Sequence, residues 1–572
     1  MPLRHGFTSR QRLILAAAFA TAATLWLVIV YRHSAPLIWA DSCGYVSAAR
    51  TIHNEGVFGY RLVQLNPDTL ADPPEIVRGG WWPPLYSFVI SLVAGDGINT
   101  VEGVEGALFG LNLAGQLASL ALLGWLIASA TGSISAGLVA VGLYALSGPS
   151  MWESPRVVSE HLFMPLLLGA LLAQHGAVRS GRLWLSLLAG VLWGLAALTR
   201  HNALVLLACA CLAALIVLWR GGFRRVLMGA LVPGLLGLLI WGAWAVRNLM
   251  VTGEVIGGYY APGTFDPVLE TVKTLRGYLE GFATVPWSAS PWPSLRIALS
   301  LSTALLVIVV WLLSIRWTTR DRTVPKAQRW LVASGALITA VSLAMLISTN
   351  MKFHINVPLG RFMLPPLVGT LCVFLPAAVR ANSSRAALFV LSTCLVLGGL
   401  ESGASRLMQP SGRALTKACR PDVSAPLLGG ALRDRPVLLA SGPDLAPASV
   451  ILAVSLYLPE VKTLYWIDSP PYTGVTVDSG HVRRLATRTG MRHVLQGPAL
   501  PAVFERYWPG THRVPMVPVR LQDALRERAR AKFADADELQ RDRTRPLVIS
   551  TRVTAAGGAW RLLELEPAEP PR

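Results

Sequence analysis

The sequence predicts an α-helical polytopic membrane protein with about eleven transmembrane helices, followed by a small α/β domain outside the membrane. The composition is the first reason. Of the 572 residues, 53% are hydrophobic and 15% are charged, whereas a soluble protein carries about 25% charged residues. The second reason is that many apolar runs approach the roughly 20 residues needed to cross ~30 Å of hydrocarbon. These runs stop near residue 401, where strand-like and helix-like pieces begin.

The first apolar run covers residues 13–31 and follows three arginines. No clear small-residue cleavage site follows it, so we interpret it as a signal-anchor helix and not as a signal peptide. The further predicted spans are residues 104–128, 133–149, 160–177, 183–198, 202–219, 226–247, 296–316, 330–349, 363–380 and 386–401.

The formal net charge of +19 could indicate a nucleic-acid partner. The arginines instead form short clusters between apolar runs, as expected at cytoplasmic membrane boundaries, so no nucleic-acid partner is expected. The clusters are Arg4, Arg10 and Arg12; Arg179 and Arg182; Arg220, Arg224 and Arg225; Arg316 to Arg329; and Arg380 and Arg385. All of them fall on one side of the predicted topology. The positive-inside rule therefore predicts a cytoplasmic N-terminus, and the odd number of spans puts the C-terminus outside.

Two large segments are then expected outside: a first loop over residues 32–103, and a tail over residues 401–572 that follows a membrane domain of residues 1–400. In the tail, residues 435–440 and 461–467 are predicted strands, and residues 481–489 and 521–532 are predicted helices. The proline-rich end, residues 566–572, is predicted to be disordered.

The six cysteines have no metal-ligand spacing, so no metal site is predicted and no cofactor is required; a bound divalent metal is an open alternative that no motif indicates. Cys43 and Cys419 both lie in outside segments, where a disulfide between them is an open alternative. Four more lie in predicted spans as packing residues: Cys209, Cys211, Cys372 and Cys394. The pair Asp535 and Asp537 is interpreted as part of a solvated helix face.

The most informative stretch follows the first span, where Asp41, Tyr45 and Ala49 are spaced one helical turn apart. A helix would align them on one face. A carboxylate just outside the bilayer can act as general base on a hydroxyl or amine acceptor. The structural alternative is that Asp41 only caps the helix.

Two other stretches combine polar and apolar character. Trp82-Pro-Pro-Leu-Tyr86 cannot form a regular mid-membrane helix, so a re-entrant or surface-lying helix is expected to follow it. Farther on, Glu153, Glu160 and His161 stand at the outer mouth of a span. Ionisable groups at the edge of hydrocarbon are costly and usually line a cavity. A solvated loop end is the alternative.

Basic residues on the outer side break the positive-inside pattern. They are Arg200, Arg247, Lys352, His354 and Arg361. A buried anion such as a lipid phosphate would stabilise them through charge-assisted hydrogen bonds. Snorkelling of each side chain to the surface is the alternative.

Five motifs, in this order along the chain, resemble the GT-C superfamily of membrane glycosyltransferases, specifically the branch with protein mannosyltransferases and lipid A aminoarabinose transferases. They are Asp41 with Tyr45, Trp82-Pro-Pro-Leu-Tyr86, Ser159-Glu-His-Leu-Phe163, Leu198-Thr-Arg-His-Asn202 and Arg361-Phe-Met-Leu-Pro-Pro366. The resemblance covers roughly residues 10–400. It implies a bacterial inner-membrane enzyme with a polyprenyl-phosphate sugar as donor and a lipid, glycan or protein as acceptor.

The resemblance also implies residue roles, with Asp41 as the catalytic base that activates the acceptor. The substrate-binding candidates are Tyr45, Arg78, Tyr86, Glu160, His161, Arg200, Arg247, Lys352, His354 and Arg361. Two positions depart from many relatives: Ser42 follows the aspartate where an acidic residue is common, and Trp82 stands where a basic residue precedes the prolines. Arg78 could substitute for the latter. The first loop has no DxD motif, which disfavours a metal-dependent oligosaccharyltransferase.

Two other classes of function are compatible with a chain of this architecture: a flippase or transporter for lipid-linked sugars, and an inactive GT-C-like scaffold. Transporters commonly show repeated halves and broken helices at the midplane. No such repeat is found in the sequence, so the transferase is preferred.

Overall fold

In the computed structural model, the described residues are 40–64, 75–78, 82–145, 147–154, 157–256, 311–316, 323–352 and 360–380, the single residues 271, 274 and 321, and five tail strands. The chain divides into two compact units. Unit 1 comprises residues 1–37, 79–93 and 105–412, and unit 2 comprises residues 38–78, 94–104 and 413–572.

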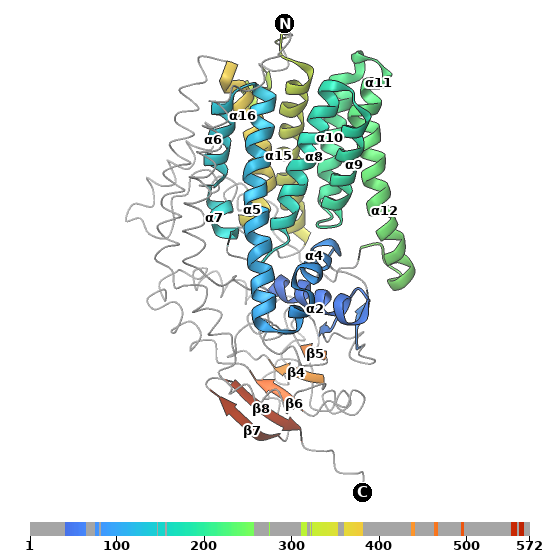
Figure 1. Cartoon of the computed structure of the whole chain (residues 1–572), viewed down its shortest axis with the longest axis vertical. Helices are drawn as coiled ribbons and strands as arrows, with labels where there is room; N and C mark the ends of the chain where they lie inside the picture. The colour runs from blue at the N-terminus through green and yellow to red at the C-terminus, as the bar shows by residue number, and fades with distance from the viewer. Residues whose placement is uncertain are drawn as a thin grey trace, which may run out of the picture. The chain divides into compact units, whose positions relative to one another are not determined.

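Unit 1 is a bundle of apolar helices (Figure 1). In chain order they are α4 (Leu85–Ala94), α5 (Val101–Thr131, whose first residues belong to unit 2), α6 (Ile134–Ala145), α7 (Gly148–Glu153), α8 (Glu160–Ser180), α9 (Leu183–Ala197), α10 (Ala203–Leu218), α11 (Phe223–Val226), the π-helical turn η3 (Leu227–Leu231), α12 (Val232–Thr252), α15 (Lys326–Lys352) and α16 (Gly360–Arg380). Apart from the span at 133–149, each predicted span that falls on described residues is essentially helical. The spans at 13–31 and 386–401 lie outside those residues, and only 311–316 of the span at 296–316 is described.

Among the described residues, four helices are long and apolar enough to cross a membrane: Val101–Thr131, Glu160–Ser180, Phe223–Thr252 and Lys326–Thr349. The predicted span at 133–149 differs from its expectation. It is a 12-residue helix, α6, followed by the separate short helix α7. The side chain of Ser147 caps α7 by accepting a hydrogen bond from the Ser150 amide, and Pro149 occupies its first turn. A capping serine followed by proline starts a new helix instead of continuing the old one.

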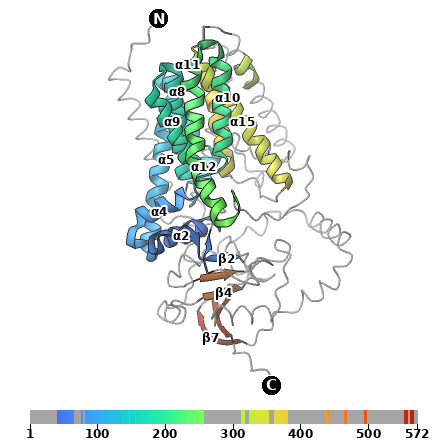
Figure 2. The same cartoon turned by 90° about the vertical axis from the view of Figure 1, so that its right-hand side faces the viewer.

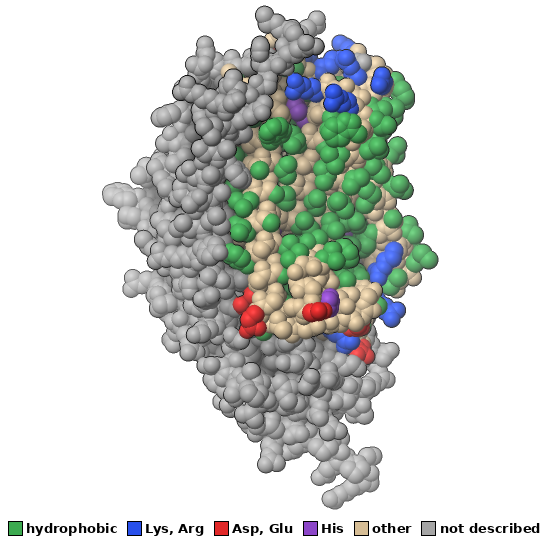
Figure 3. All heavy atoms as spheres, in the orientation of Figure 1, with side chains coloured by type: hydrophobic (Ala, Val, Ile, Leu, Met, Phe, Trp, Pro, Cys, Tyr) green, Lys and Arg blue, Asp and Glu red, His purple; other side chains and the backbone are tan. Residues whose placement is uncertain are grey.

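The bundle has an apolar exterior and one basic end. Large hydrophobic side chains are exposed along the outward faces of α9, α10 and α12, for example Leu187 at 43%, Ile216 at 65% and Leu239 at 69%. Figure 3 shows this green surface with the larger group of blue lysines and arginines at its upper end and a smaller blue group at its lower right. A continuous exposed apolar surface of this kind suits contact with lipid.

Consecutive helices alternate in direction and pack side by side, as both views show for α8, α9 and α12 (Figures 1 and 2). Arg179 and Arg182 therefore lie at the same end of the bundle as Arg224 and Arg225, which all are exposed. The opposite end receives the start of α8, the turn between α9 and α10, and the end of α12. That end contains four of the ionisable residues predicted to be functional: Glu160, His161, Arg200 and Arg247.

Near the basic end, a buried polar network ties α8 to α9 and to the π-helical turn. Gln174 donates from Nε2 to the Gly229 carbonyl at 2.8 Å and accepts from Trp193 Nε1 at 2.9 Å. Ser186 Oγ donates to the Met228 carbonyl at 2.7 Å. A π-helical turn disturbs the regular backbone hydrogen bonds, and these side chains supply partners to two of its carbonyl oxygens.

Small residues set the closest helix contacts. Gly335 of α15 faces Gly369 of α16, and a Cβ added at Gly335 would lie 2.5 Å from the Gly369 carbonyl oxygen. A Cβ at Gly115 of α5 would overlap the carbonyl oxygen of His161 on α8. In lipid, where apolar burial between helices contributes little, such close backbone approach is a main source of helix association.

Unit 2 contains helix α2 (Ala40–Glu55), a small antiparallel pair of β1 (Gly59–Tyr60) and β3 (Val77–Arg78), and a six-stranded sheet. The sheet order is β2-β5-β4-β6-β8-β7, with β2 (Leu62–Gln64), β4 (Pro436–Ala440), β5 (Thr463–Trp466), β6 (His493–Gln496), β7 (Thr551–Gly557) and β8 (Trp560–Leu565). The first four strands in this order pair in parallel, and β8 and β7 join antiparallel.

The two strands predicted in the tail are confirmed as β4 and β5. The predicted tail helices, the proline-rich end and the Asp535–Asp537 pair lie outside the described residues. Cys43 is buried in α2, and Cys419 lies outside the described residues, so their disulfide stays a prediction.

Candidate functional site

The site residues predicted from the sequence belong to both units, and each unit is described by itself. In unit 2, α2 begins at Ala40, so Asp41 lies in the first helical turn and not at the N-cap position before it. The side chain of Asp41 lies outside the described residues. Tyr45 and Ala49, on the same helical face by spacing, are buried at 3% and 0% exposure.

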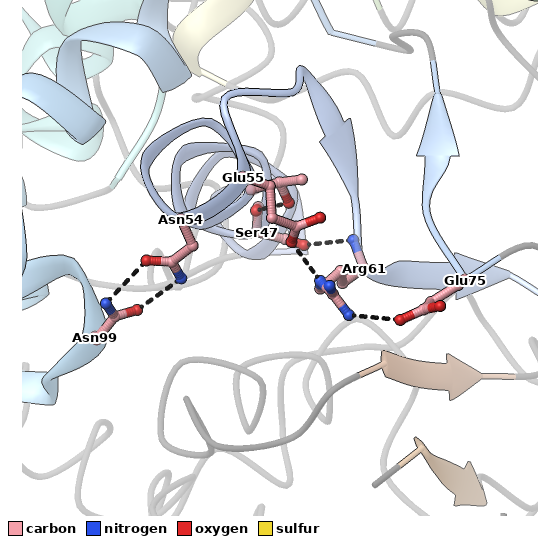
Figure 4. A network of polar contacts seen from close by, with 7 residues as sticks. Ser47, Asn54, Glu55, Arg61, Glu75 and Asn99 are labelled. Atoms are coloured by element: carbon pink, nitrogen blue, oxygen red, sulfur yellow. Dashed lines mark hydrogen bonds and ion pairs between the residues drawn. The ribbon is translucent and has the colours of Figure 1, made fainter. Parts of the chain in front are cut away.

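The far half of α2 is fixed by polar contacts within unit 2. Arg50 donates to the Ile98 carbonyl at 3.0 Å, and Asn54 exchanges hydrogen bonds with Asn99, both at 3.0 Å. Arg61 is paired with Glu55 at 2.8 Å and Glu75 at 3.2 Å, while its amide donates to Ser47 Oγ (Figure 4). Arg78 is exposed on β3.

In unit 1, the turn between α9 and α10 carries the ion pair of Arg200 with Glu160, the first residue of α8. The Glu160 side chain is 3% exposed and the Arg200 side chain is 18% exposed. The guanidinium carbon of Arg200 also lies 5.3 Å from the ring centroid of Phe362 on α16, a cation–π distance. Glu160 and Arg200, predicted separately, are therefore in direct contact.

Around this pair, the structure gathers further predicted residues. His161 donates from Nε2 to the Glu153 carbonyl at 3.1 Å, and both side chains are buried. Tyr86 is fully buried on α4, the short helix expected after the two prolines. The amide of Leu85 donates to the Leu198 carbonyl at 2.9 Å, which anchors α4 to the end of α9.

Arg247 lies near the end of α12, half-buried. The side chains of Lys352 and Arg361 and the whole of His354 lie outside the described residues, so their roles stay predictions. Asp41, Tyr45 and Arg78 belong to unit 2, so they are not assigned a distance to the Arg200 pair.

Aromatic partners of His201 were missed from the sequence. Trp241 Nε1 donates to His201 Nδ1 at 3.2 Å, and the ring of Trp244 lies 5.2 Å from the imidazole centroid. Burial and the neighbouring Arg200 lower the pKa of His201 to about 4, so this turn residue is neutral at physiological pH. The spacing of Trp241, Trp244 and Asn248 at three and four residues was the available signal, because it puts them on one face of α12.

No group of three or more His, Cys, Asp or Glu side chains suited to a metal occurs among the described residues. The described side chains at this end of unit 1 offer a cation, a buried carboxylate, neutral hydrogen-bond donors and aromatic faces.

Comparison with solved structures gives the fold. Over 88% of this chain and 37% of the other, the chain matches the mycobacterial arabinofuranosyltransferase AftD with a TM-score of 0.50 and 16% identity. It has a GT-C-like fold. This chain thus spans little more than a third of AftD.

Two other GT-C structures were also found. ArnT from Cupriavidus metallidurans in the apo state matches at a TM-score of 0.45 and 13% identity over 97% of this chain and 98% of that one. The oligosaccharyltransferase AglB from Archaeoglobus fulgidus, in complex with an inhibitory peptide and a dolichol-phosphate, matches at a TM-score of 0.48 and 12% identity. The match covers 86% of this chain and 70% of that one. No protein-family model matches the sequence, and no curated protein matches it either.

Proposed function

We propose that this GT-C-like protein transfers a sugar from a polyprenyl phosphate to a lipid, glycan or protein acceptor at the outer face of the bacterial inner membrane. The observation that carries the proposal is the group of ionisable side chains held at one end of an apolar bundle. Arg200, Glu160 and His161 are all partly or fully buried there. Ionisable residues at membrane depth are costly and mark functional sites.

Arg200 is suited to hold the donor phosphate. It makes an ion pair with Glu160 through one nitrogen, and an arginine has five N–H donors in a fork that matches phosphate oxygens. Glu160 and Phe362 fix the guanidinium in place, so that its remaining donors are oriented before the lipid arrives. As the bond from sugar to phosphate breaks, negative charge grows on the leaving phosphate, which a fixed cation stabilises.

Asp41 is proposed as the general base. It removes the proton from the acceptor hydroxyl or amine, the acceptor attacks the anomeric carbon, and the polyprenyl phosphate leaves in one inverting step. The buried face of α2 with Tyr45 and Ala49 gives the first turn a fixed support. The orientation follows from charge: the arginine-rich end of the bundle faces the cytoplasm and the Arg200 end faces outward.

The test is transfer of radiolabel from a polyprenyl-phosphate sugar to acceptors in isolated membranes. Asp41→Asn should lower transfer at least ~100-fold, the contribution expected of a general base, with membrane insertion intact. Asp96→Asn is the matched control, because Asp96 is an exposed carboxylate of unit 2 that pairs only at the surface with His53. Transfer by the Asp41→Asn protein at the wild-type rate would overturn the assignment of the base.

The same assay separates the proposal from a flippase and from an inactive scaffold. Neither of those would move label onto an acceptor. Wild-type membranes that bind the donor but label no acceptor, across donors with pentoses and hexoses, would overturn the transferase.

A further inference from the structure

Three polar atoms, one each on His201, Trp244 and Asn248, are buried without a hydrogen-bond partner. Each of them can be assigned as a donor or an acceptor. The indole N–H of Trp241 can only donate, so His201 Nδ1 must accept at their 3.2 Å contact. The proton of the neutral imidazole is then on Nε2, and that N–H is buried with no hydrogen-bond acceptor.

The second atom is Nε1 of Trp244, a donor that is likewise buried and unpaired. The third is Oδ1 of Asn248. Asn248 is fully buried, and its Nδ2 donates to the Val255 carbonyl at 3.3 Å, which fixes the amide orientation and leaves Oδ1 as an unpaired acceptor. An unmade hydrogen bond on a buried polar group costs about 1–3 kcal/mol. Three in one place indicate a ligand.

The residues that carry these atoms are neighbours in the fold. The imidazole of His201 and the ring of Trp244 are 5.2 Å apart between centroids. Asn248 stands four residues after Trp244 on α12, so the two share one face of that helix. The group combines two neutral donors, one neutral acceptor and two indole rings.

That combination distinguishes between ligands. A phosphate has only acceptor oxygens in its ionised form, so it would satisfy the two donors but face the Asn248 oxygen unfavourably. Apolar lipid would leave all three atoms unpaired. A sugar hydroxyl both donates and accepts, and the apolar face of a sugar ring packs on an indole.

We infer that His201, Trp244 and Asn248 bind the hydroxyl groups of the sugar carried by the donor, and thereby select which sugar is transferred. The inference rests on the proposed function and deepens it. Two adjacent residues of one turn then bind different parts of the donor: Arg200 binds the phosphate, and His201 binds the sugar. Both residues are in the turn between α9 and α10.

The test compares two lipids on the purified full-length protein: polyprenyl phosphate that carries a sugar, tried as a panel of pentoses and hexoses, and polyprenyl phosphate alone. Trp244→Phe keeps an aromatic ring and removes only the N–H and part of the ring area. It should weaken binding of the sugar-bearing lipid about five- to tenfold, since a hydrogen bond contributes ~1 kcal/mol. Binding of the sugar-free lipid should stay within about twofold of wild type.

Trp184→Phe is the matched control, because Trp184 is 57% exposed on the outward side of α9 and should change neither affinity. His201→Phe should act in the same direction as Trp244→Phe. If His201→Phe does not fold, because it leaves the Trp241 N–H unpaired, the Trp244→Phe result decides alone.

Equal weakening for both lipids would overturn the inference, since the atoms would then serve the phosphate or the lipid chain. An unchanged preference for the sugar-bearing lipid in Trp244→Phe would overturn it as well. Failure of the proposed function is read separately, because the membrane transfer assay then labels no acceptor, whichever lipid the purified wild-type protein binds.

Discussion

Two buried polar clusters lie toward opposite ends of the same bundle, and they differ in whether their polar atoms have hydrogen-bond partners. Around Gln174, both amide atoms and the Trp193 N–H have partners between 2.8 and 2.9 Å. Around Arg200, atoms of Glu160, His201 and Trp244 are buried without a partner. A satisfied network is what packing alone can explain. An unsatisfied one in the same apolar surroundings has a cost that a ligand can remove, so burial of polar groups alone does not identify a site.

The largest expected effect comes from breaking the Arg200–Glu160 pair. Arg200→Gln leaves the Glu160 carboxylate buried and uncompensated, so it should lower the free energy of unfolding by about 3–5 kcal/mol. The double variant Arg200→Gln with Glu160→Gln should recover most of that stability and still transfer no sugar. Thermal unfolding in detergent and the membrane transfer assay measure the two quantities. A double variant with restored transfer would show that the pair is only structural.

A variant in the Gln174 network should lose stability but keep transfer activity. Gln174→Leu removes the partner of the Trp193 N–H and of the Gly229 carbonyl, which should cost about 1–3 kcal/mol of stability. Transfer per folded molecule should be unchanged, because no ligand is proposed there. Stability is read from thermal unfolding and activity is normalised to folded protein. A loss of transfer larger than the loss of folded protein would remove the distinction between the clusters.

The smallest effect is a pH dependence from His201. Its folded-state pKa is lowered to about 4 by burial and Arg200, against about 6.5 in the unfolded chain. Between these values the unfolded state binds more protons, so the stabilising contribution is complete above about pH 6.5 and is lost as pH falls toward 4. Wild type should lose roughly 1 kcal/mol more than His201→Gln between pH 7.5 and 5.5. Identical pH profiles would mean that the imidazole is solvated.

How far the sequence predicted the molecule depended on the kind of signal. Apolar runs located the helices α5, α8, α12 and α15 well, because burial and lipid exposure both require them to be apolar. The helix break after Ala145 was not predicted, because the sequence of α6 and α7 forms one hydrophobic run. The signals of the break are the N-cap Ser147 and the proline that follows it, Pro149.

Within the site, Glu160 and Arg200 were singled out because charges are rare among apolar residues, and the structure pairs them although the sequence did not predict their contact. Trp241 and Trp244 were not, because tryptophans are common at membrane interfaces. The role proposed for Trp244 depends on which atoms stay unpaired after the turn at His201 has packed on α12. That is a property of three-dimensional contact, and residue types alone do not show it.

The pairing of β2 with β5 has a consequence for how the chain can be divided. Residues 62–64, which follow α2 closely, form the outermost strand beside residues from far along the sequence. A shortened protein that ends near residue 401 would leave β2 without its partner strand. An isolated tail would expose the unpaired edge of β5 to solvent. The helix that carries Asp41 and the last 160 or so residues therefore have to be produced, purified and studied as one piece.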